Sequence, residues 1–310
     1  MAEPTPTGKE SNAPTRCGFV ALIGAPNVGK STLVNALVGS KVTIVSPKVQ
    51  TTRTLVRGIA MEGRAQLVFI DTPGIFAPRR RLDRAMVTSA WSGAHDADIV
   101  ALLIDAKSGI DEEADAILGR LGDVASRKLL ILNKVDLVQK PKLLALAQEA
   151  NGRAQFAATF MVSALTGDGI GEVKAWLAAQ APEGPWHYPE DQISDAPLRS
   201  LASEITREKL FNRLHQELPY RSTVETDSWK ELRDGSVRIE QTIFVERESQ
   251  RKIVLGKSGQ SIKAIGAEAR GEIAKIIDQP VHLFLFVKVR EDWGDDPERF
   301  REMGLEFPKE

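Results

Sequence analysis

Short apolar runs recur through the first half of the chain, and they are continuous rather than alternating with polar residues. They lie at 19–23, 67–70, 99–104, 129–132 and 160–162. Strands that are apolar throughout are typical of a parallel sheet buried on both faces. Between these runs, the spacing of apolar residues predicts helices over 31–38, 82–93, 112–121 and 142–149. Strands that alternate with helices indicate an α/β domain.

The pattern changes after this region. Residues 181–189 contain three prolines and one glycine, a composition typical of a linker. A helical stretch is predicted at 197–216, and apolar residues then alternate with polar ones at 237–246 and 281–289. This alternation predicts a sheet with one covered face. Between the two strands, apolar residues recur at helical steps of three and four: Ile262, Ile265, Ala269, Ile273 and Ile276.

These patterns divide the chain into four segments. We expect a tail at 1–16, an α/β domain at 17–181, a linker at 182–196 and a smaller α+β domain at 197–310. The tail contains Pro, Thr, Ser and charged residues without an apolar core, so it predicts a disordered segment rather than a secretory signal. No apolar run approaches the ~20 residues that span a bilayer, and a cytoplasmic setting is the default expectation.

Composition narrows the classes of function. The 310 residues favour about two domains. The 41 Lys+Arg residues balance 42 Asp+Glu residues, which excludes a chain that is basic overall but not a basic patch in one domain. Cys17 is the one cysteine, so a disulfide framework and a cysteine metal cluster are excluded. The four histidines are scattered without ligand-type spacing, and we interpret them as structural or surface residues.

A glycine-containing motif follows the first apolar run and opens the first predicted helix. It reads Gly24-Ala25-Pro26-Asn27-Val28-Gly29-Lys30-Ser31, followed by Thr32. In this context, glycines let successive main-chain N–H groups point at phosphates, and the positive end of the helix adds to their field. Lys30 would reach the β- and γ-phosphates, and the Ser31 hydroxyl would bind Mg²⁺. The motif therefore predicts a nucleotide site rather than a chance glycine turn.

Three further motifs follow apolar runs, at the carboxyl ends of strands where open α/β sheets bind ligands. They are Asp71-Thr72-Pro73-Gly74, Asn133-Lys134-Val135-Asp136 and Ser163-Ala164-Leu165. Asp71 can hold magnesium through water, and Gly74 can donate its N–H to the γ-phosphate. A buried carboxylate at Asp136 can accept two hydrogen bonds from a guanine edge, which adenine cannot offer. The main chain of the third motif can meet the guanine oxygen, so the predicted ligands are GTP and GDP.

The order of these motifs resembles the translation-factor class of GTPases. This resemblance assigns Gln50-Thr51-Thr52-Arg53 to the first switch, where a threonine senses the γ-phosphate and binds magnesium. We choose Thr52 over Thr51 because Thr52 precedes Arg53. The resemblance implies that Lys30, Thr52 and Gly74 act in catalysis, while Ser31, Thr52 and Asp71 hold magnesium.

Ile75 stands where Ras-like enzymes have the glutamine that orients the attacking water. The water-positioning residue is therefore not assigned, and slow intrinsic hydrolysis is expected. In several related GTPases, an asparagine at the position of Asn27 helps to bind a potassium ion beside the phosphates. Such an ion would offset charge that develops on the transferred group. The alternative is that Asn27 only hydrogen-bonds within the loop, and the sequence leaves both interpretations open.

The second domain carries a sequence that resembles a KH RNA-binding motif. Its Gly256-Lys257-Ser258-Gly259 loop would clamp the backbone of about four nucleotides. Ile262 and Lys263, at the start of the following helix, complete the expected RNA-contacting set. The alternative is a glycine turn beside a solvated lysine face. The strand, loop and helix in this order favour RNA.

From about residue 17, the chain resembles the Era family of bacterial ribosome-assembly GTPases. This resemblance implies a P-loop GTPase domain with a mostly parallel sheet, followed by a smaller α+β KH domain with a βαα start. It implies binding near the 3′ end of small-subunit ribosomal RNA, a role in assembly of the small ribosomal subunit, and peripheral contact with the inner face of the cell membrane. DNA is not an expected partner. The tail and the acidic end after Asp292 lie outside the resemblance.

Two other functions compete with an RNA-binding GTPase. One is a GTPase switch whose second domain binds a protein partner. The other is a structural RNA-binding protein with a relic nucleotide fold, and the joint presence of Lys30, Ser31, Asp71 and Asp136 argues against it. Salt dependence of RNA binding would separate the first alternative from the preferred function.

Overall fold

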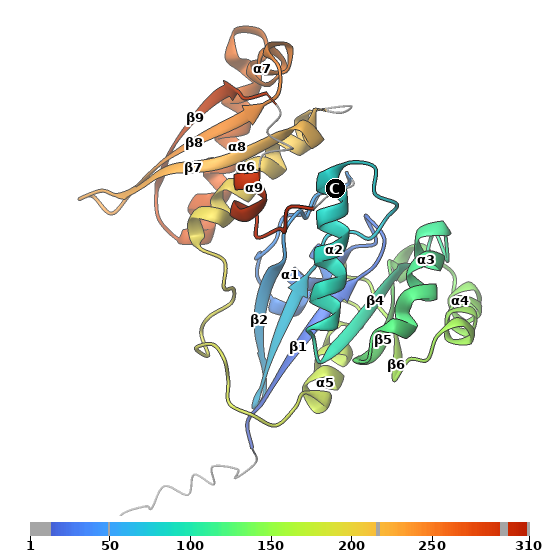
Figure 1. The fold of residues 1–310 in the computed structure, drawn as a ribbon. Helices are drawn as coiled ribbons and strands as arrows, with labels where there is room; N and C mark the ends of the chain where they lie inside the picture. The colour runs from blue at the N-terminus through green and yellow to red at the C-terminus, as the bar shows by residue number, and fades with distance from the viewer. Residues whose placement is uncertain (1–13, 49, 215–217, 292–296, 309–310) are drawn as a thin grey trace, which may run out of the picture.

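A computed structural model of the chain describes residues 14–48, 50–214, 218–291 and 297–308 (Figure 1). Most of the predicted tail lies outside these ranges, and its last residue, Arg16, begins the first strand. The chain forms an α/β unit with a mostly parallel sheet, followed by a smaller α+β unit, which confirms the predicted fold class.

The first unit contains a six-stranded sheet in the order β2-β3-β1-β4-β5-β6. Its strands are β1 (Arg16–Ile23), β2 (Val56–Glu62), β3 (Ala65–Asp71), β4 (Ile99–Asp105), β5 (Arg127–Asn133) and β6 (Ala158–Met161). β2 pairs antiparallel with β3, and the other neighbours are parallel. All residues of β3 are buried, as its apolar run predicts. β2 is an edge strand of mixed polarity, which the apolar pattern does not predict.

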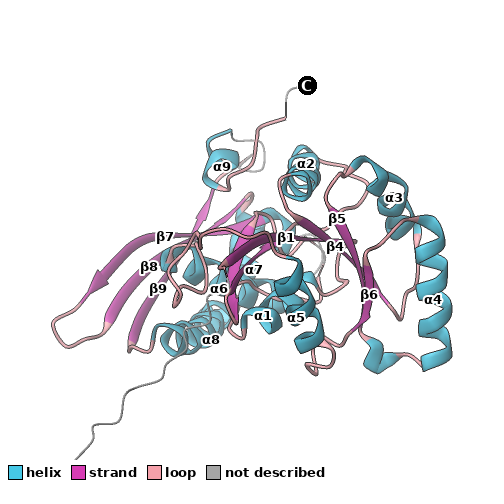
Figure 2. Ribbon diagram, turned by 90° about the horizontal axis from the view of Figure 1, so that it is seen from below, coloured by secondary structure: helices cyan, strands magenta, loops and turns pink. Residues whose placement is uncertain are grey.

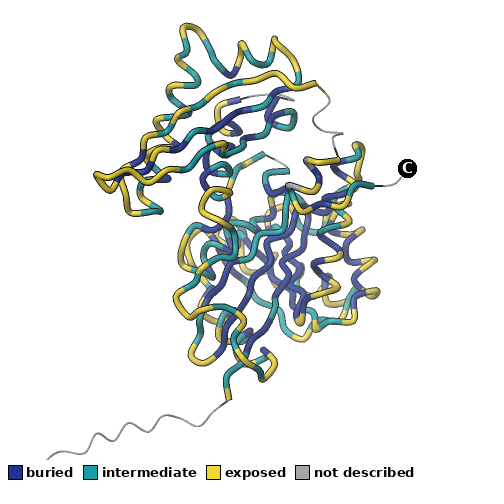
Figure 3. The backbone as a smooth tube through the Cα atoms, turned by 60° about the vertical axis from the view of Figure 1, so that its left-hand side comes forward, coloured by how far each residue is buried: buried dark blue, intermediate teal, exposed yellow. Residues whose placement is uncertain are grey.

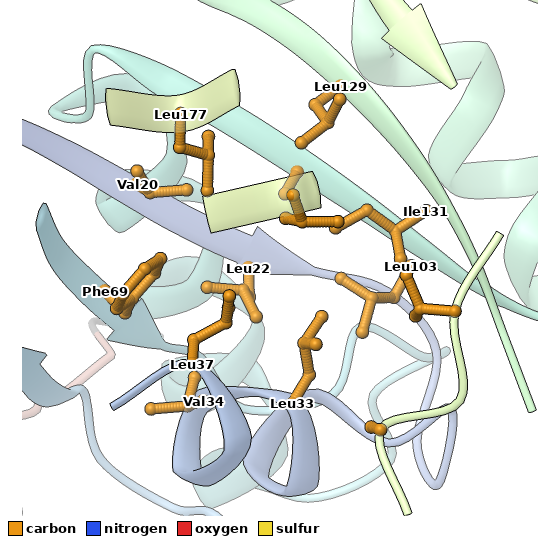
Figure 4. Close-up of a cluster of buried hydrophobic side chains, with 14 of the residues drawn as sticks. Val20, Leu22, Leu33, Val34, Leu37, Phe69, Leu103, Leu129, Ile131 and Leu177 are labelled. Atoms are coloured by element: carbon orange, nitrogen blue, oxygen red, sulfur yellow. The ribbon is translucent and has the colours of Figure 1, made fainter. Parts of the chain in front are cut away.

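Helices cover both faces of this sheet. They are α1 (Lys30–Val38), α2 (Arg81–His95), α3 (Glu112–Arg120), α4 (Lys140–Arg153) and α5 (Ile170–Gln180), with short 3-10 turns η1 (Leu121–Asp123) and η2 (Val135–Leu137). Leu37 of α1 and Leu177 of α5 belong to one buried cluster (Figure 4). Trp91 of α2, Ile117 of α3 and Leu146 of α4 belong to a second cluster. The four predicted helices are present with slightly different ends, and α5 is additional.

The predicted linker packs along the first unit. The N–H of Ile59 in β2 donates to the Ile193 oxygen at 2.8 Å. Gln66 of β3 donates to the Tyr188 oxygen at 2.8 Å and accepts from the His187 N–H at 2.9 Å. Hydrogen bonds to two strands therefore fix the path of this segment.

The second unit has a three-stranded sheet in the order β7-β8-β9. Its elements are α6 (Leu198–Arg213), η3 (Pro219–Arg221), β7 (Ser222–Glu231), β8 (Val237–Val245), α7 (Glu248–Leu255), η4 (Lys257–Gly259), α8 (Gln260–Ile277), β9 (Val281–Val289) and α9 (Pro297–Glu302). β8 runs antiparallel to β7 and parallel to β9. The implied βαα start is wrong: α6 and β7 precede the β8-α7-α8 run, so this run lies in the middle of the unit and only β9 of its sheet follows it. Helix α7 separates β8 from the glycine loop. Residues 215–216 of the predicted helical stretch lie outside the described ranges.

One face of the second sheet is covered by α6 and α8, because Ile205 of α6 and Ile273 of α8 share a buried cluster with Ile239 of β8. Figure 3 shows such buried stretches, in dark blue, inside both units. Ile265 and Ile273 of α8 are buried, as the helical stripe predicts. Thr242, one of the polar positions of the alternating pattern in β8, is buried, and its hydroxyl donates to the Asp227 carboxylate at 2.7 Å. Across the described part of the chain, every helix is too short or too polar to cross a bilayer.

The last described residues of the chain return to the first unit. α9 lies beside α2 in two perpendicular views (Figures 1 and 2). Phe300 of α9 and Met86 of α2 are both fully buried in one cluster. The last part of the predicted second domain therefore packs on the first.

Candidate nucleotide site and RNA-binding loop

The phosphate loop lies between β1 and α1 and requires glycine at two positions. Gly24 has φ of 154°, and a Cβ there would lie 2.6 Å from the Leu103 oxygen. Gly29 caps α1 with φ of 98°, and a Cβ there would lie 2.3 Å from Asn133 Nδ2. These positions allow the main chain to curl tightly before the helix begins. The N–H groups at the start of α1 then lie at the positive end of the helix, where anions bind.

Lys30 is buried within this loop. Its ammonium group donates to the main-chain oxygens of Gly24 at 3.1 Å and Ala25 at 2.9 Å. Burial lowers the pKa of Lys30 to about 8, although the charge of Asp71 acts in the opposite direction. A bound polyphosphate would offset this desolvation, because its negative charge favours the protonated amine.

Hydroxyl groups from three segments meet the carboxylate of Asp71. Asp71 Oδ2 accepts hydrogen bonds from Ser31 at 2.7 Å and Thr43 at 2.8 Å, and Thr52 lies 3.3 Å away. Ser31 Oγ and Thr52 Oγ1 are 2.9 Å apart. Burial raises the pKa of Asp71, and these hydrogen bonds lower it in part. Sequence reasoning missed Thr43, because nothing in its local sequence marks it.

The other Asp71 oxygen provides a test of the expected magnesium site. Oδ1 is buried and has no hydrogen-bond partner among the described residues. A buried carboxylate oxygen without a partner is costly, and a cation or its bound water would satisfy it. Hydroxyl and carboxylate oxygens are also the ligands that Mg²⁺ prefers. The residues present therefore fit magnesium.

The first-switch segment closes over this cluster. A cleft of about 410 Å³ lies between the phosphate loop and residues 44–47 and 50–52, which we include in the first-switch segment. Thr52 reaches Ser31, whereas the Thr51 hydroxyl donates to the Lys48 oxygen at 2.7 Å. The geometry thus brings Thr52, and not Thr51, to the expected metal ligands.

The Asp71 motif leads from β3 to the phosphate loop. The Thr72 hydroxyl donates to the Leu22 oxygen at 2.6 Å, and the N–H of Ile75 donates to the Gly24 oxygen at 3.0 Å. A Cβ on Gly74 would lie 2.9 Å from the Pro26 ring, so glycine permits this close approach. Ile75 itself packs in the buried cluster that contains Trp91. Its side chain is therefore directed into the core and does not act on water.

Asn133 and Lys134 join the expected base-recognition loops to the phosphate loop. Asn133 donates to the Val28 oxygen at 2.8 Å and accepts from the Ala164 N–H at 3.0 Å. The Lys134 ammonium donates to the Asn27 oxygen at 2.7 Å and to the Asp105 carboxylate at 2.6 Å. Three loops that are far apart in sequence thus form one hydrogen-bonded rim. One main-chain donor expected for the base, the Ala164 N–H, is engaged by Asn133.

Two residues of this rim are exposed. Asp136 lies in the short turn η2 beyond the end of β5, with its carboxylate open to a ligand. Leu165 is also 83% exposed. Ser163 is fully buried, and its hydroxyl accepts from the Thr166 N–H at 3.2 Å.

Asn27 is held with positive φ, and its side chain reaches the first switch. The amide nitrogen donates to the Pro47 oxygen at 3.1 Å. The bond therefore leaves the phosphate loop, in contrast to the alternative of a bond within it. Among the described residues, its side-chain oxygen accepts no hydrogen bond. That oxygen is free to serve as a ligand for a monovalent cation.

The second unit holds the first switch from outside, an arrangement that the sequence did not reveal. Arg53 donates to the oxygens of Ser222 at 2.9 Å and Pro219 at 3.2 Å. Arg207 of α6 donates to the Thr51 oxygen at 2.5 Å. Burial, followed by the charge of Arg207, lowers the pKa of Arg53 to about 9. Glu208 also accepts from the Val45 N–H at 2.8 Å.

The predicted RNA-binding loop lies between α7 and α8. Gly256 has φ of 72°, and a Cβ there would lie 2.7 Å from Ser261 Cβ. Ser258 and Gly259 also have positive φ, so the loop bends sharply. The side chains of Lys257 and Ser258 are exposed on it. Lys263 is exposed on the first turns of α8, and Ile262 is half-buried beside it. An exposed lysine on a sharply bent glycine loop fits close approach of a phosphate backbone.

Two family descriptions match this chain. Residues 19–134 match the family described as "50S ribosome-binding GTPase", and residues 217–294 match the KH domain. The first range contains the phosphate loop and the Asp71 motif, and the second contains the Gly256–Gly259 loop.

Relatives match nearly the whole chain. GTPase Era of Afipia carboxidovorans is 73% identical over 97% of this chain and 98% of its own length. GTPase Era of Rhizobium meliloti is 67% identical over 98% of both chains.

Solved structures agree with these relatives. A crystal structure of Era in complex with MgGDPNP and nucleotides 1506–1542 of 16S ribosomal RNA covers 94% of this chain and 99% of that one, with 36% identity and a TM-score of 0.89. An Aquifex aeolicus Era variant bound to GDP.AlF4⁻ gives the same values. This chain belongs to the Era family of GTPases.

Proposed function

We propose that this protein is a GTP-hydrolysing switch that binds small-subunit ribosomal RNA near its 3′ end and assists assembly of the small ribosomal subunit. The observation that carries the proposal is the union, in one chain, of the Asp71–Ser31–Thr52 cluster and an exposed KH loop. One relative of known structure, which covers 94% of this chain, was solved with MgGDPNP and nucleotides of 16S ribosomal RNA.

In this proposal, the residues of the nucleotide site have defined tasks. Lys30 would bind the β- and γ-phosphates, Ser31 and Thr52 would hold magnesium, and Asp71 would hold it through water. Bound magnesium supplies positive charge that offsets charge on the transferred phosphoryl group. The Gly74 N–H donates to the γ-phosphate. Because Ile75 is buried, the attacking water must be oriented by another group, and intrinsic hydrolysis is slow.

We propose the small subunit rather than the large one because of how much of this chain each comparison covers. The family description that names the 50S particle matches residues 19–134, within the GTPase unit. The structure that contains 16S ribosomal RNA resembles the chain across both units. Since RNA contact is expected through the second unit, the match that includes this unit is the more informative.

The test is direct binding of an RNA from the 3′ end of 16S ribosomal RNA in the presence of a non-hydrolysable GTP analogue. Affinity should exceed that for a scrambled RNA of equal length, and it should fall when salt is raised, because phosphate contacts release counterions. A Lys257→Asp/Ser258→Asp variant should bind this RNA much more weakly. Its basal GTP hydrolysis without RNA should be unchanged, because the loop belongs to the other unit.

Two outcomes would contradict the proposal. Equal affinity for the natural and scrambled RNA would remove the 3′-end assignment. RNA affinity that survives in the Lys257→Asp/Ser258→Asp variant would show that this loop is not the RNA site. If the protein bound no RNA at any salt concentration, the proposal that the second unit binds RNA would be replaced by the alternative that it binds a protein partner.

The proposal places the protein in the cytoplasm, with peripheral contact at the inner face of the cell membrane as a separate part. The membrane contact is supported by the family resemblance alone. Flotation of the full chain with anionic lipid vesicles, compared with neutral vesicles, tests it. Failure to float with either kind would remove the membrane contact and leave the RNA proposal intact.

A further inference from the structure

The last described residues, 297–308, lie against the helix that follows the Asp71 motif, and we call them the C-terminal segment (Figures 1 and 2). One buried cluster joins the two elements. Its members are Leu82, Ala85 and Met86 of α2 and Phe300, Met303, Leu305 and Phe307 of the C-terminal segment. The helix of a nucleotide switch is thus covered by the end of its own chain.

The contact is close and involves aromatic rings. Phe300 and Met86 are completely buried, and Leu305 is 4% exposed. The rings of Phe300 and Phe307 meet edge to face with centroids 4.9 Å apart. The Arg81 guanidinium, in the first turn of α2, lies 4.9 Å from the centroid of the Phe307 ring. Burial of this kind fixes the position of the first turns of α2, because tightly packed side chains leave little room to shift.

The same turn of α2 contacts the first switch. The Asp83 carboxylate is buried, and it accepts from the N–H groups of Arg79 at 3.1 Å and Arg80 at 3.0 Å. Its other oxygen accepts from the Gln50 side-chain amide at 3.1 Å. Gln50 lies two residues before Thr52, which reaches Ser31 and Asp71. Packing of Phe300 on α2, the hydrogen bond from Gln50 to Asp83 and the short backbone from Gln50 to Thr52 therefore connect Phe300 with the Asp71–Ser31–Thr52 cluster.

We propose that the C-terminal segment is an intrachain brace for GTP binding and hydrolysis, and that Phe300 is a positioning residue that acts through α2, Asp83 and Gln50 on Thr52. The inference rests on the proposed GTP hydrolysis and not on RNA binding. Without the brace, a smaller fraction of molecules holds Thr52 in place. The apparent affinity for GTP then falls in proportion to the fraction of molecules that hold Thr52 in place. GDP lacks the γ-phosphate that Thr52 senses, so its affinity is unaffected.

The experiment compares full-length wild-type protein with Phe300→Ala in the absence of RNA. Equilibrium titrations measure affinity for a non-hydrolysable GTP analogue and for GDP, and single-turnover assays measure hydrolysis. We expect affinity for the analogue to fall by about fivefold or more, the lower end of typical coupling between sites. The hydrolysis rate should fall as well, while affinity for GDP stays within twofold of wild type.

Matched variants separate positioning from loss of structure. Phe286→Ala is the control, because Phe286 is 49% exposed in the same unit and belongs to no buried cluster of the described residues. Gln50→Asn shortens the amide that reaches Asp83, and asparagine tolerates the positive φ of this position. It should reproduce the loss of GTP preference. Phe300→Ala should then add little in the Gln50→Asn background, because the path is already broken.

Several results would overturn the brace. Phe300→Ala with wild-type affinity for both nucleotides would show that the contact does not matter to the switch. Equal loss of affinity for both nucleotides would indicate a structural role alone. Faster hydrolysis would mean that the segment holds the switch inactive. If the losses of affinity for the GTP analogue caused by Phe300→Ala and by Gln50→Asn add fully in the double variant, the path through Asp83 is excluded. A wild-type protein that does not hydrolyse GTP would instead contradict the proposed function.

Discussion

The side-chain amide of Asn133 donates a 2.8 Å hydrogen bond to the main-chain oxygen of Val28. Asn133 ends β5, and Val28 lies inside the phosphate loop, so this bond joins the part of the site expected to read the base to the part expected to hold the phosphates. The same amide would lie 2.3 Å from a Cβ at Gly29. Its fit therefore depends on glycine at that position.

Replacing Asn133 with alanine should weaken both GTP and GDP binding to a similar extent. The substitution leaves the Val28 oxygen and the Ala164 N–H without their partner, and each buried unsatisfied group costs roughly 1–3 kcal/mol. Thermal unfolding of the nucleotide-free variant should begin at a lower temperature. A variant that discriminates between the two nucleotides would contradict this structural role.

Asp136→Asn should change the choice of base. If the carboxylate accepts two hydrogen bonds from guanine, their loss weakens GTP binding by about 10²–10⁴-fold, at roughly 1.5–3 kcal/mol for each bond to a charged acceptor. Binding of xanthosine triphosphate should improve relative to GTP, because its carbonyl suits an amide donor. Competition titrations with both nucleotides measure the ratio. Unchanged GTP affinity would remove Asp136 from the site.

Hydrolysis should depend on the monovalent cation. The free Asn27 oxygen is a candidate ligand for potassium beside the phosphates, and such an ion would offset developing charge. We expect hydrolysis at least about tenfold faster in potassium chloride than in sodium chloride, below the roughly 10³–10⁵ that an arginine finger contributes. Asn27→Ala should abolish the difference. Equal rates in both salts, with saturating magnesium, would point to a catalytic group supplied by a partner.

Nucleotide affinity should fall as pH rises above about 8. The pKa of Lys30 in the free protein is about 8 because the amine is buried, and bound phosphates would raise it. Binding above pH 8 then requires uptake of a proton, so affinity falls by up to tenfold for each pH unit and is flat below that range. Titrations with fluorescent GDP between pH 7 and 9 measure the effect. The same pH dependence in Lys30→Ala would assign it to another group.

Much of the nucleotide site could be predicted from the sequence, since its loops follow continuous apolar strands. The position of Thr52 beside Ser31 follows from the order of motifs in the same way. Two of the edge strands, β2 and β7, could not be predicted in this way: β2 contains Arg57 and Gly58, and β7 contains mostly polar residues. Such strands bury one face or one end, so their apolar pattern is too weak to detect.

Contacts between the two units could not be predicted. Arg53 resembles an ordinary residue of a polar loop, and only the fold brings it to the carbonyl oxygens of η3 and β7. Thr43 and Asp83 are likewise isolated in sequence and acquire partners through tertiary structure. Phe300 lies in a region that resembles no motif, and its burial depends on a helix more than two hundred residues away. The local sequence pattern contains no information about such contacts between distant residues.

Thr52 and Arg53 are neighbours in the chain but are held by different halves of the protein. Thr52 contacts Ser31 and Asp71, whereas Arg53 contacts oxygens of the second unit. A thermodynamic cycle therefore links the two halves, and its coupling factor is the same in both directions. If GTP strengthens binding of a ligand to the second unit by a given factor, that ligand strengthens GTP binding by the same factor. The path between the two sets of contacts is short, because a single peptide bond joins Thr52 to Arg53.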